Sequence, residues 1–200
     1  MASTRILLVR HGQSTWNALG KWQGRADPPL SPLGQQQAAS AAARVGIVDA
    51  VIASPLVRAR QTAEIIAEGI GIGPVDTDDR LIETDAGDWT GLTFHEIRTG
   101  WPGWLDQHKW PDNFEKEIDI VARMAEALID TAARYPGASV VAVTHSGAMR
   151  NLDRSLGDHD PSIPNLAARW YDVNEFSITG GERLLLADPE HTTFTGSAQV

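Results

Sequence analysis

The stretch from residue 7 to residue 17, Leu-Leu-Val-Arg-His-Gly-Gln-Ser-Thr-Trp-Asn, decides how this chain is interpreted. The short apolar run from Ile6 to Val9 predicts a buried strand, and Arg10 and His11 follow it directly. Because α/β sheets present their ligands at the ends of strands, we expect a cation and an imidazole at that edge. Gly12 allows close backbone approach, and the short polar side chains after it can bond an oxyanion.

A second apolar strand ends in the same way, in Val143-Thr144-His145-Ser146-Gly147. A single His at the end of a strand is more often a structural hydrogen-bonding group. Two strands that each end in His next to Gly favour one shared site, to which His11 and His145 both belong.

The remaining pattern alternates strands and helices, which predicts an α/β fold with a mostly parallel sheet. Ser31-Pro32 and Ser54-Pro55 each combine a helix cap with proline at the first helical position. We expect helices over residues 31–44, 54–69, 93–100, 115–135 and 146–156, and strands over residues 49–53 and 139–143. A terminal β-hairpin over residues 170–179 and 182–187, turning at Gly180-Gly181, would add an antiparallel edge.

Four motifs, in order, resemble the histidine phosphatase superfamily, also called phosphoglycerate mutase-like proteins. They are RHGQSTWN from residue 10, SPLVRARQTA from residue 54, LIETDAGDWTG from residue 81 and VTHSG from residue 143. The resemblance implies a three-layer α/β/α sandwich with a mostly parallel mixed sheet and an antiparallel edge. It also implies a phosphomonoester hydrolase that acts on a small phosphorylated metabolite through a phosphohistidine intermediate.

The resemblance assigns roles to individual residues. His11 would be the nucleophile, since neutral imidazole is nucleophilic near pH 7. Arg10 and Arg58 would fork onto phosphate oxygens, and His145 would be the second active-site histidine. Glu83 would protonate the leaving oxygen and then activate water, with Asp85 and Asp88 as competing carboxylates. The residues expected to bind substrate are Asn17, Gln23, Gly24 and Ser146.

The composition of the chain limits the kinds of partner that we expect. Lys and Arg number 17 against 26 Asp and Glu, a net charge of −9, which disfavours nucleic acid or an anionic membrane as a partner. With no cysteine, the chain has no thiolate nucleophile and no Cys-ligated zinc. The apolar run near the N-terminus is too short for a signal-peptide core and no segment approaches a membrane span, so we expect a cytoplasmic protein.

We expect a single domain over residues 1–200, with residues of about 84–115 forming a lid. Trp101, Trp104 and Trp110 lie within ten positions of one another there, and could form a substrate lid, a plug of the core or a dimer contact. Many phosphatases of the family carry Gly-Glu-Ser just before the long helix. This chain has Phe114-Glu115-Lys116, which keeps only the glutamate.

Three other functions remain as alternatives. A cofactor-dependent phosphoglycerate mutase would use the same cationic group, but such mutases carry Arg-His-Tyr-Gly after the acid where this chain has residues 85–91. A non-catalytic phospholigand-binding regulator should have lost Arg10, His11 or His145. A metal-dependent phosphatase would need clustered ligands, which the scattered remaining histidines do not supply. The leading hypothesis therefore needs a phosphate ester as substrate and no cofactor or metal, with a homodimer as one open alternative.

Overall fold

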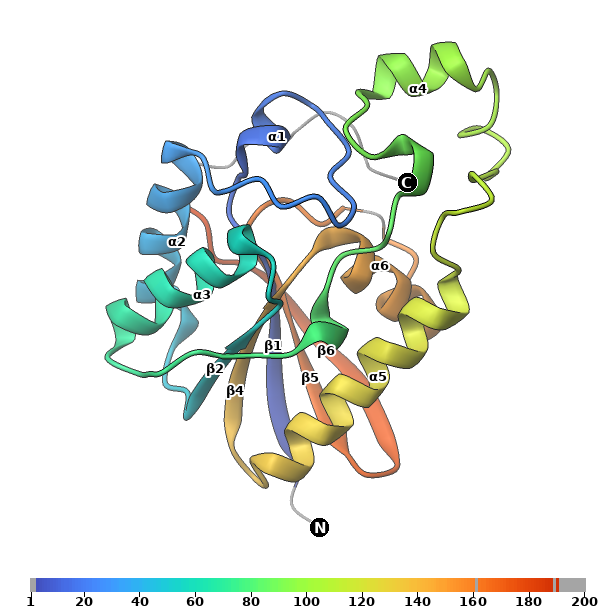
Figure 1. Ribbon diagram of the computed structural model, residues 1–200. Coiled ribbons are helices and arrows are strands. Elements are labelled where there is room, and N and C mark those ends of the chain that lie inside the picture. Colours follow the sequence, from blue (N-terminus) through green and yellow to red (C-terminus); the bar gives the residue numbers. More distant parts are fainter. Residues whose placement is uncertain (1–2, 161, 189, 191–200) are drawn as a thin grey trace.

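The computed structural model describes residues 3–160, 162–188 and 190. Six strands and six α-helices follow one another in these described residues, and Figure 1 shows how they are arranged. The strands are β1 (Thr4–Arg10), β2 (Ala50–Ala53), β3 (Asp76–Thr77), β4 (Ser139–Thr144), β5 (Ala167–Asn174) and β6 (Ser177–Leu185). The helices are α1 (Thr15–Ala18), α2 (Pro32–Val45), α3 (Val57–Ile70), α4 (Phe94–Gly100), α5 (Glu117–Arg134) and α6 (Ser146–Ser155), with 3₁₀ turns at Asp79–Leu81 and Gly87–Trp89.

The strands form one mixed sheet in the order β3-β2-β4-β1-β5-β6. The pairs from β3 to β1 are parallel, whereas β5 runs antiparallel to both β1 and β6. This arrangement confirms the predicted α/β fold, with a mostly parallel sheet and an antiparallel edge.

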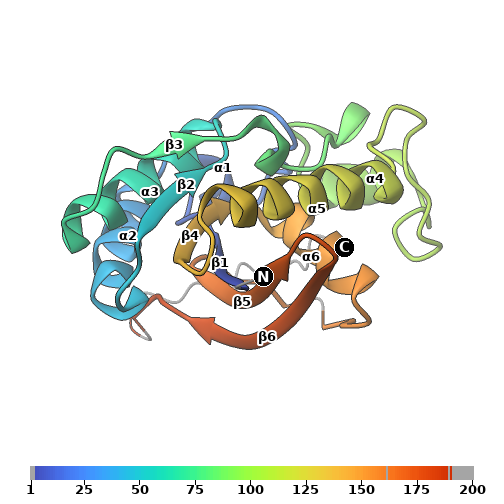
Figure 2. The ribbon, with the colours of Figure 1, turned by 90° about the horizontal axis from the view of Figure 1, so that it is seen from below.

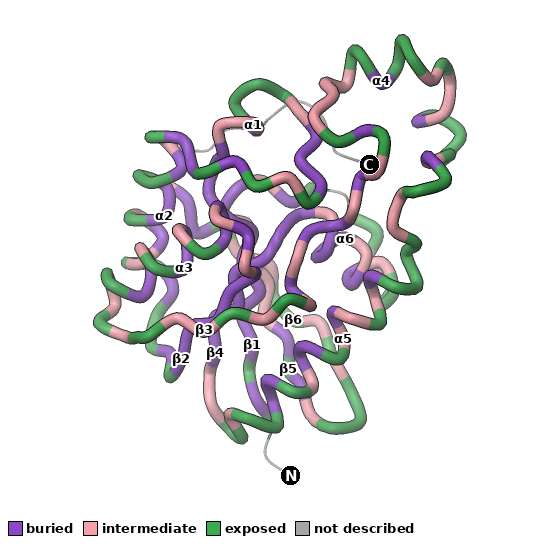
Figure 3. Tube along the Cα trace, in the orientation of Figure 1, coloured by how far each residue is buried: buried purple, intermediate pink, exposed green. Residues whose placement is uncertain are grey.

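Alternating side chains of β1 face opposite layers of helices. Ile6 and Leu8 are fully buried in a cluster with residues of α5 and α6. Leu7 and Val9 are fully buried in a second cluster with residues of α2 and α3. Figures 1 and 2 show α2 and α3 together on one side of the sheet and α5 and α6 on the other. Burial on both faces explains why β1 is a continuous apolar run, and Figure 3 shows the central strands buried over most of their length.

The helix predicted over residues 54–69 corresponds to α3, and its predicted start is wrong by about two residues. Ser54 does not cap α3; the helix begins at Val57, after Leu56 in an extended conformation. The cap comes from a distant loop, because Asp27 Oδ1 accepts a hydrogen bond of 2.6 Å from the backbone N–H of Val57. By contrast Ser31 caps α2 as expected, and its side chain accepts from the N–H of Gly34.

The predicted hairpin exists, but its turn does not lie at Gly180-Gly181. The turn follows Asn174, whose Oδ1 accepts hydrogen bonds from the backbone N–H groups of Phe176 and Ser177 at 2.9 and 3.0 Å. Gly180 lies inside β6 and pairs with Tyr171, beside an irregularity in the register. A Cβ on Gly180 would lie 2.5 Å from Nη2 of Arg169, so this glycine permits a close approach rather than a turn.

A third, smaller hydrophobic cluster lies apart from the two that cover the sheet. Trp89 is fully buried at its centre, and the rings of Trp22, Trp101 and Trp110 contact it edge-on at centroid distances of 5.4, 6.0 and 5.5 Å. Phe114 stacks on Trp110 at 5.0 Å. The tryptophan-rich segment therefore packs in its own aromatic cluster. Figure 3 shows the chain around α4 lying beyond the end of the sheet.

Candidate active site

The sheet register brings the two histidines together. β1 and β4 are parallel neighbours in which Arg10 pairs with Thr144, and the N–H of His11 donates to the carbonyl of Thr144 at 3.0 Å. Both strands therefore end at the same level, and the ring centroids of His11 and His145 lie 5.1 Å apart. The predicted shared site at the strand ends is thus formed by adjacent strands of one sheet.

The imidazole of His11 is held in a defined tautomer. Its Nδ1 lies 2.6 Å from the backbone carbonyl oxygen of Gly12, which can only accept, so Nδ1 carries the proton. In the neutral ring the lone pair then resides on Nε2. Burial, together with the charges of Arg58 and Arg10, holds the pKa of His11 well below its ordinary value. At neutral pH, His11 is therefore uncharged, and its unprotonated Nε2 faces Arg58.

Gly12 is required by the packing of this loop. A Cβ on Gly12 would lie 2.6 Å from the carbonyl oxygen of Gly34, in the first turn of α2. A Cβ on Gly34 would in turn lie 2.0 Å from the carbonyl oxygen of Gln13. The close backbone approach expected at Gly12 is therefore an approach to α2.

Arg58 and Arg10 supply buried positive charge beside His11. Arg58 is fully buried, and its Nε donates to Nε2 of His11 at 3.3 Å. Its other two nitrogens donate to the carbonyls of Ala26 and Gly24 at 2.7 and 3.0 Å, which fixes the plane of the guanidinium. Arg10 is 6% exposed and donates to the carbonyl of Ile163, while its Nε has no hydrogen-bond partner among the described residues. Burial lowers the pKa of both arginines to about 10, which leaves them charged at neutral pH.

His145 is fully buried and oriented by Ser54. Its Nε2 lies 2.8 Å from Oγ of Ser54, the residue that sequence reasoning assigned to a helix cap. Within the described part of the chain its Nδ1 has no hydrogen-bond partner. Burial, followed by the charge of Arg58, lowers the pKa of His145 well below its ordinary value. An anion bound between these groups would reverse that effect and favour the protonated imidazole.

Glu83 lies at the N-terminus of α6. Its carboxylate accepts hydrogen bonds from the backbone N–H groups of Gly147 and Ala148 at 3.1 and 2.9 Å, and from that of Thr84 at 2.8 Å. A Cβ on Gly147 would lie 2.5 Å from Oε1 of Glu83, so only glycine allows this approach. Of the three acidic candidates, Glu83 is the one that is buried, at 8% exposure, whereas Asp85 is half-buried and Asp88 is exposed. The charge of Glu83 acts on both Arg10 and Arg58.

The residues expected to close over phosphate form a buried hydrogen-bonded loop. The hydroxyl of Ser14 donates to Oε1 of Gln23 at 2.6 Å, and Oδ1 of Asn17 accepts from the N–H of Ser14 at 3.1 Å. Gly24 contributes the carbonyl that Arg58 binds. Ser146 is buried at the first position of α6, next to His145. All four predicted binding residues thus lie beside the cationic group or in the loop bonded to it.

An ion pair holds the segment that carries Glu83, residues 80–86, which we call the Glu83 loop. Arg123 donates from Nη1 to the carbonyls of Arg80 and Ile82 at 2.7 and 2.6 Å, before Glu83. The same guanidinium binds Glu115 through Nε and Nη2 at 2.8 and 3.1 Å. Glu115 then accepts from the N–H of Asp85 at 3.0 Å, after Glu83. The loop is therefore anchored on both sides of its carboxylate.

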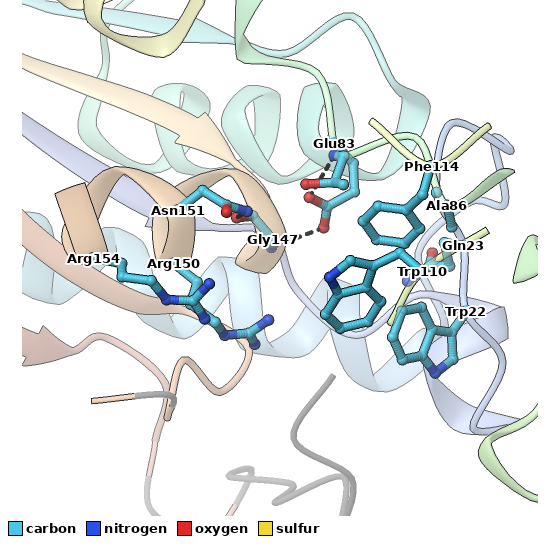
Figure 4. A pocket seen from close by; sticks show the side chains of 12 residues that line it. Trp22, Gln23, Glu83, Ala86, Trp110, Phe114, Gly147, Arg150, Asn151 and Arg154 are labelled. Carbon is cyan, nitrogen blue, oxygen red and sulfur yellow. Dashed lines mark hydrogen bonds between the residues drawn. The ribbon is translucent and has the colours of Figure 1, made fainter. Parts of the chain in front are cut away.

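Glu83 also lines a pocket, which Figure 4 shows from close by. Aromatic side chains form one wall and two arginines of α6 form the opposite wall, with Glu83 between them. The lining residues are Trp22, Gln23, Gly24, Glu83, Thr84, Ala86, Trp110, Phe114, Gly147, Arg150, Asn151 and Arg154.

The acidic residues that could be considered as metal ligands form ion pairs with arginines. The chain contains two Asp-x-Asp stretches, at residues 76–78 and 158–160. Asp78 pairs with Arg80 at 2.7 Å, and Asp158 pairs with Arg169 and Arg183 at 2.8 and 3.0 Å. Among the described residues, no group of three or more His, Cys, Asp or Glu side chains is arranged to hold a metal ion.

Comparison with known proteins decides the family. The sequence matches the histidine phosphatase superfamily (branch 1) over residues 6–187. The chain belongs to this superfamily. A glucosyl-3-phosphoglycerate phosphatase of Mycolicibacterium vanbaalenii is similar to this chain. It is 34% identical over 207 residues, which cover 94% of this chain and 92% of that protein.

Two further proteins are similar to this chain. A bifunctional protein of Mycobacterium tuberculosis is 37% identical over 159 residues, which are 76% of this chain but only 43% of that protein, so the chain spans less than half the length of this relative. The solved structure of a mycobacterial glucosyl-3-phosphoglycerate phosphatase complexed with VO3 superposes with a TM-score of 0.78. It is 28% identical in sequence, with 88% of this chain and 96% of that chain covered.

Sequence reasoning missed several residues of this site. Ser54 beside His145 was visible only as a proline-linked cap, and Asn165, whose Nδ2 donates to the carbonyl of His11 at 2.9 Å, carried no sequence signal. The arginines of α6 did carry a sequence signal, because Arg150 and Arg154 are four residues apart on a helix that begins beside His145.

None of the helices within the described residues has the length and hydropathy that a membrane span requires.

Proposed function

We propose that this histidine phosphatase is a phosphomonoester hydrolase that acts on a small phosphorylated metabolite through a phosphohistidine at His11. The observation that carries the proposal is the hydrogen bond of 2.6 Å between Nδ1 of His11 and the Gly12 carbonyl. It directs the lone pair of Nε2 toward Arg58, within a group of buried cations that would bind a phosphate. A regulator without catalytic function would not need this tautomer.

In the first step, Nε2 of His11 attacks phosphorus and the bond between phosphorus and the ester oxygen breaks. The departing oxygen takes a proton from the carboxyl group of Glu83, so an alcohol leaves and a phosphohistidine remains. Arg10, Arg58 and protonated His145 stabilise the charge on the phosphoryl oxygens.

In the second step, the carboxylate of Glu83 takes a proton from a water molecule, whose oxygen attacks phosphorus. The bond between phosphorus and Nε2 breaks, which releases inorganic phosphate and restores neutral His11. The backbone N–H groups of Gly147 and Ala148 hold the carboxylate in place for this role. The cycle returns every group to its starting state without a cofactor or metal ion.

The names of the relatives suggest the kind of substrate. One relative that is matched over nearly its whole length is named a glucosyl-3-phosphoglycerate phosphatase, and its named substrate is a small phosphorylated metabolite. We propose that residues of about 84–115 act as a lid, because Trp110 and Phe114 line the pocket beside Glu83. A cytoplasmic location and a homodimer stay predictions, which cell fractionation and light scattering would test.

Rapid quench with labelled p-nitrophenyl phosphate tests the mechanism. We expect a phosphoenzyme that is labile in acid and stable in base, with the label on His11. His11→Ala should abolish turnover, while vanadate binding and circular dichroism report whether the site and fold survive. Label on Ser14 or Ser146 would overturn the phosphohistidine mechanism. Conversion of 3-phosphoglycerate to 2-phosphoglycerate with little phosphate release would assign the chain to the mutases.

A further inference from the structure

Ser54 is a buried residue of the site that the two-step mechanism does not use. It is fully buried, and its hydroxyl makes two contacts, one with Nε2 of His145 at 2.8 Å and one with the backbone N–H of Leu56 at 3.3 Å. The N–H of Leu56 can only donate, so the oxygen of Ser54 is the acceptor there. Among the described residues, the hydrogen of the hydroxyl then has Nε2 of His145 as its one acceptor.

This contact determines which nitrogen of the neutral His145 ring carries the proton. If Nε2 carried it, Nε2 would donate to Ser54, and the buried hydroxyl would be left without an acceptor. That arrangement is unfavourable, because buried polar groups normally have hydrogen-bond partners. If Nε2 instead accepts from Ser54, every hydrogen at this contact is bonded and the proton of the ring resides on Nδ1. The hydrogen bond therefore favours the Nδ1–H tautomer of His145.

A second observation indicates the same tautomer. Nδ1 of His145 and Nε of Arg10 are both buried, and neither has a hydrogen-bond partner in the part of the chain that the structure describes. The Nε of an arginine can only donate, so the missing partner of Arg10 is an acceptor. Phosphoryl oxygens bound beside His11 would satisfy both atoms if Nδ1 of His145 also donates, whereas a lone pair on Nδ1 would repel them.

The tautomer matters because the ring of His145 is neutral before a ligand binds. Burial lowers its pKa well below the ordinary value, and cationic or titratable groups at the end of β1, in α3 and in α5 lower it further. These groups are Arg58, His11, Arg123 and Arg10. A neutral imidazole has a single N–H, so a ring with its proton on Nε2 would offer phosphate no donor.

We infer that Ser54 is a positioning residue, which holds His145 as the Nδ1–H tautomer so that this ring enters phosphate binding as a hydrogen-bond donor. The inference rests on the proposed function, because it takes the ligand beside His11 to be a phosphoryl group. Both rings are then Nδ1–H tautomers, but His11 presents its lone pair on Nε2 and His145 presents its proton on Nδ1. This difference explains why one ring attacks phosphorus while the other binds its oxygens. When the bound anion favours protonation of His145, the second proton enters at Nε2 and the donor on Nδ1 stays in place.

Nitrogen-15 NMR of the histidine rings tests the tautomer in the wild-type protein. The couplings between ring nitrogens and ring C–H protons show which nitrogen carries the proton, and the signals that disappear in His145→Gln identify the ring. We expect the proton of neutral His145 on Nδ1. In Ser54→Ala, where the hydroxyl no longer donates to Nε2, the ligand-free ring should shift toward the Nε2–H tautomer. A proton on Nε2 in the neutral ring of the wild-type protein would overturn the inference.

The pH dependence of catalysis distinguishes this role from a merely structural one. Ser54→Ala should lower kcat/KM for p-nitrophenyl phosphate about 10-fold at pH 8, the effect of one hydrogen bond to a charged group. At pH 5.5 the loss should shrink to about 3-fold or less, since a protonated ring carries a hydrogen on Nδ1 whether or not Ser54 is present. The titrations of the substrate and of Glu83 are common to both proteins, so they cancel in the ratio of wild type to variant.

Two further variants show whether the hydroxyl itself is responsible. Ser54→Thr keeps the hydroxyl, so its ratio to the wild type should not change with pH, even if the added methyl group lowers activity at every pH. Thr131→Val is the matched control, because it also removes a buried hydroxyl, which bonds within α5 to the carbonyl of Ala127 at 2.7 Å. It should leave kcat/KM and its pH dependence unchanged.

The outcomes separate this inference from the proposed function. A loss in Ser54→Ala that is equal at pH 8 and pH 5.5, or no loss at all, overturns the inference and leaves a hydrolase that works through labelled His11. If circular dichroism shows that Ser54→Ala does not fold, the tautomer of the wild-type ring and the pH profile of Ser54→Thr decide the question. A protein that hydrolyses no phosphate ester, p-nitrophenyl phosphate included, overturns the proposed function and the role of Ser54 with it.

Discussion

Replacing Glu115 by Gln tests whether the ion pair with Arg123 positions Glu83 for catalysis. The carboxylate of Glu115 accepts two hydrogen bonds from Arg123, one from the N–H of Asp85 and one of 3.1 Å from Arg25. Gln retains the shape but only one acceptor oxygen, and it loses the charge. Arg123 then keeps its bonds to the Glu83 loop but loses its counter-ion.

The expected cost has a stability part and a catalytic part. The side chains of Glu115 and Arg123 are 10% and 14% exposed, so losing the charged partner should lower the free energy of unfolding by about 2–4 kcal/mol. A reacting group misplaced by about 1 Å costs about 10²-fold in rate. We therefore expect kcat/KM to fall about 10²-fold for an alkyl phosphate, whose leaving oxygen needs the proton from Glu83. For p-nitrophenyl phosphate, which needs little protonation, the loss should stay below about 10-fold.

Steady-state kcat/KM for both substrate types, measured with urea unfolding of the same samples, separates the two parts. Asp106→Asn is the control, because it breaks another Arg–carboxylate pair, with Arg98 at 3.1 Å, whose side chains are 54% and 65% exposed. Arg123→Lys is a second test, since it keeps the charge and loses the double contact with the loop carbonyls. Equal losses for both substrates in Glu115→Gln would show that Glu115 does not act through Glu83, and the positioning argument would be refuted.

Three further predictions follow from the site. Because burial and the charge of Arg58 lower the pKa of His11 and His145 well below 6.5, the unfolded chain takes up protons near pH 6.5 before the folded one does. Their contribution to stability is then complete above that pH and lost as the pH falls below it; unfolding midpoints in urea that do not decrease from pH 7 to pH 5.5 would contradict this. Gly147→Ala should displace Glu83 and lower kcat/KM for alkyl phosphates at least about 10-fold, because acid–base help of about 10²–10⁴-fold is at stake, whereas Gly100→Ala, with nothing near its Cβ, should be neutral. Activity should survive exhaustive EDTA treatment, and a loss restored by a divalent metal would overturn the metal-free mechanism.

The sequence was sufficient to predict the centre of the sheet because local and long-range preferences agree there. The apolar runs of β1 and β4 are too hydrophobic to lie anywhere except between two layers of helices. Each run ends in a histidine, so the parallel pairing that buries the strands also brings His11 and His145 together.

The errors occur where a distant residue replaces a local signal. Ser54-Pro55 has the pattern of a helix start, yet Asp27 caps the helix and Ser54 turns to His145 instead. Gly180-Gly181 has the pattern of a turn, yet Asn174 forms the turn and Gly180 makes room for Arg169. Neither Asp27 nor Arg169 is close to these positions in sequence, and local patterns therefore could not reveal them.

The aromatic cluster around Trp89 gives this protein a built-in optical probe. Of its seven tryptophans, five lie in that cluster, namely Trp22, Trp89, Trp101, Trp104 and Trp110. Intrinsic fluorescence will therefore report mainly on the region beside the pocket, while far-ultraviolet circular dichroism reports on the sheet and helices. Since Trp22 and Trp110 line the pocket, a ligand that enters it should change the emission even when no bond is broken. Comparing the two signals during denaturation would show whether this region melts together with the sheet or before it.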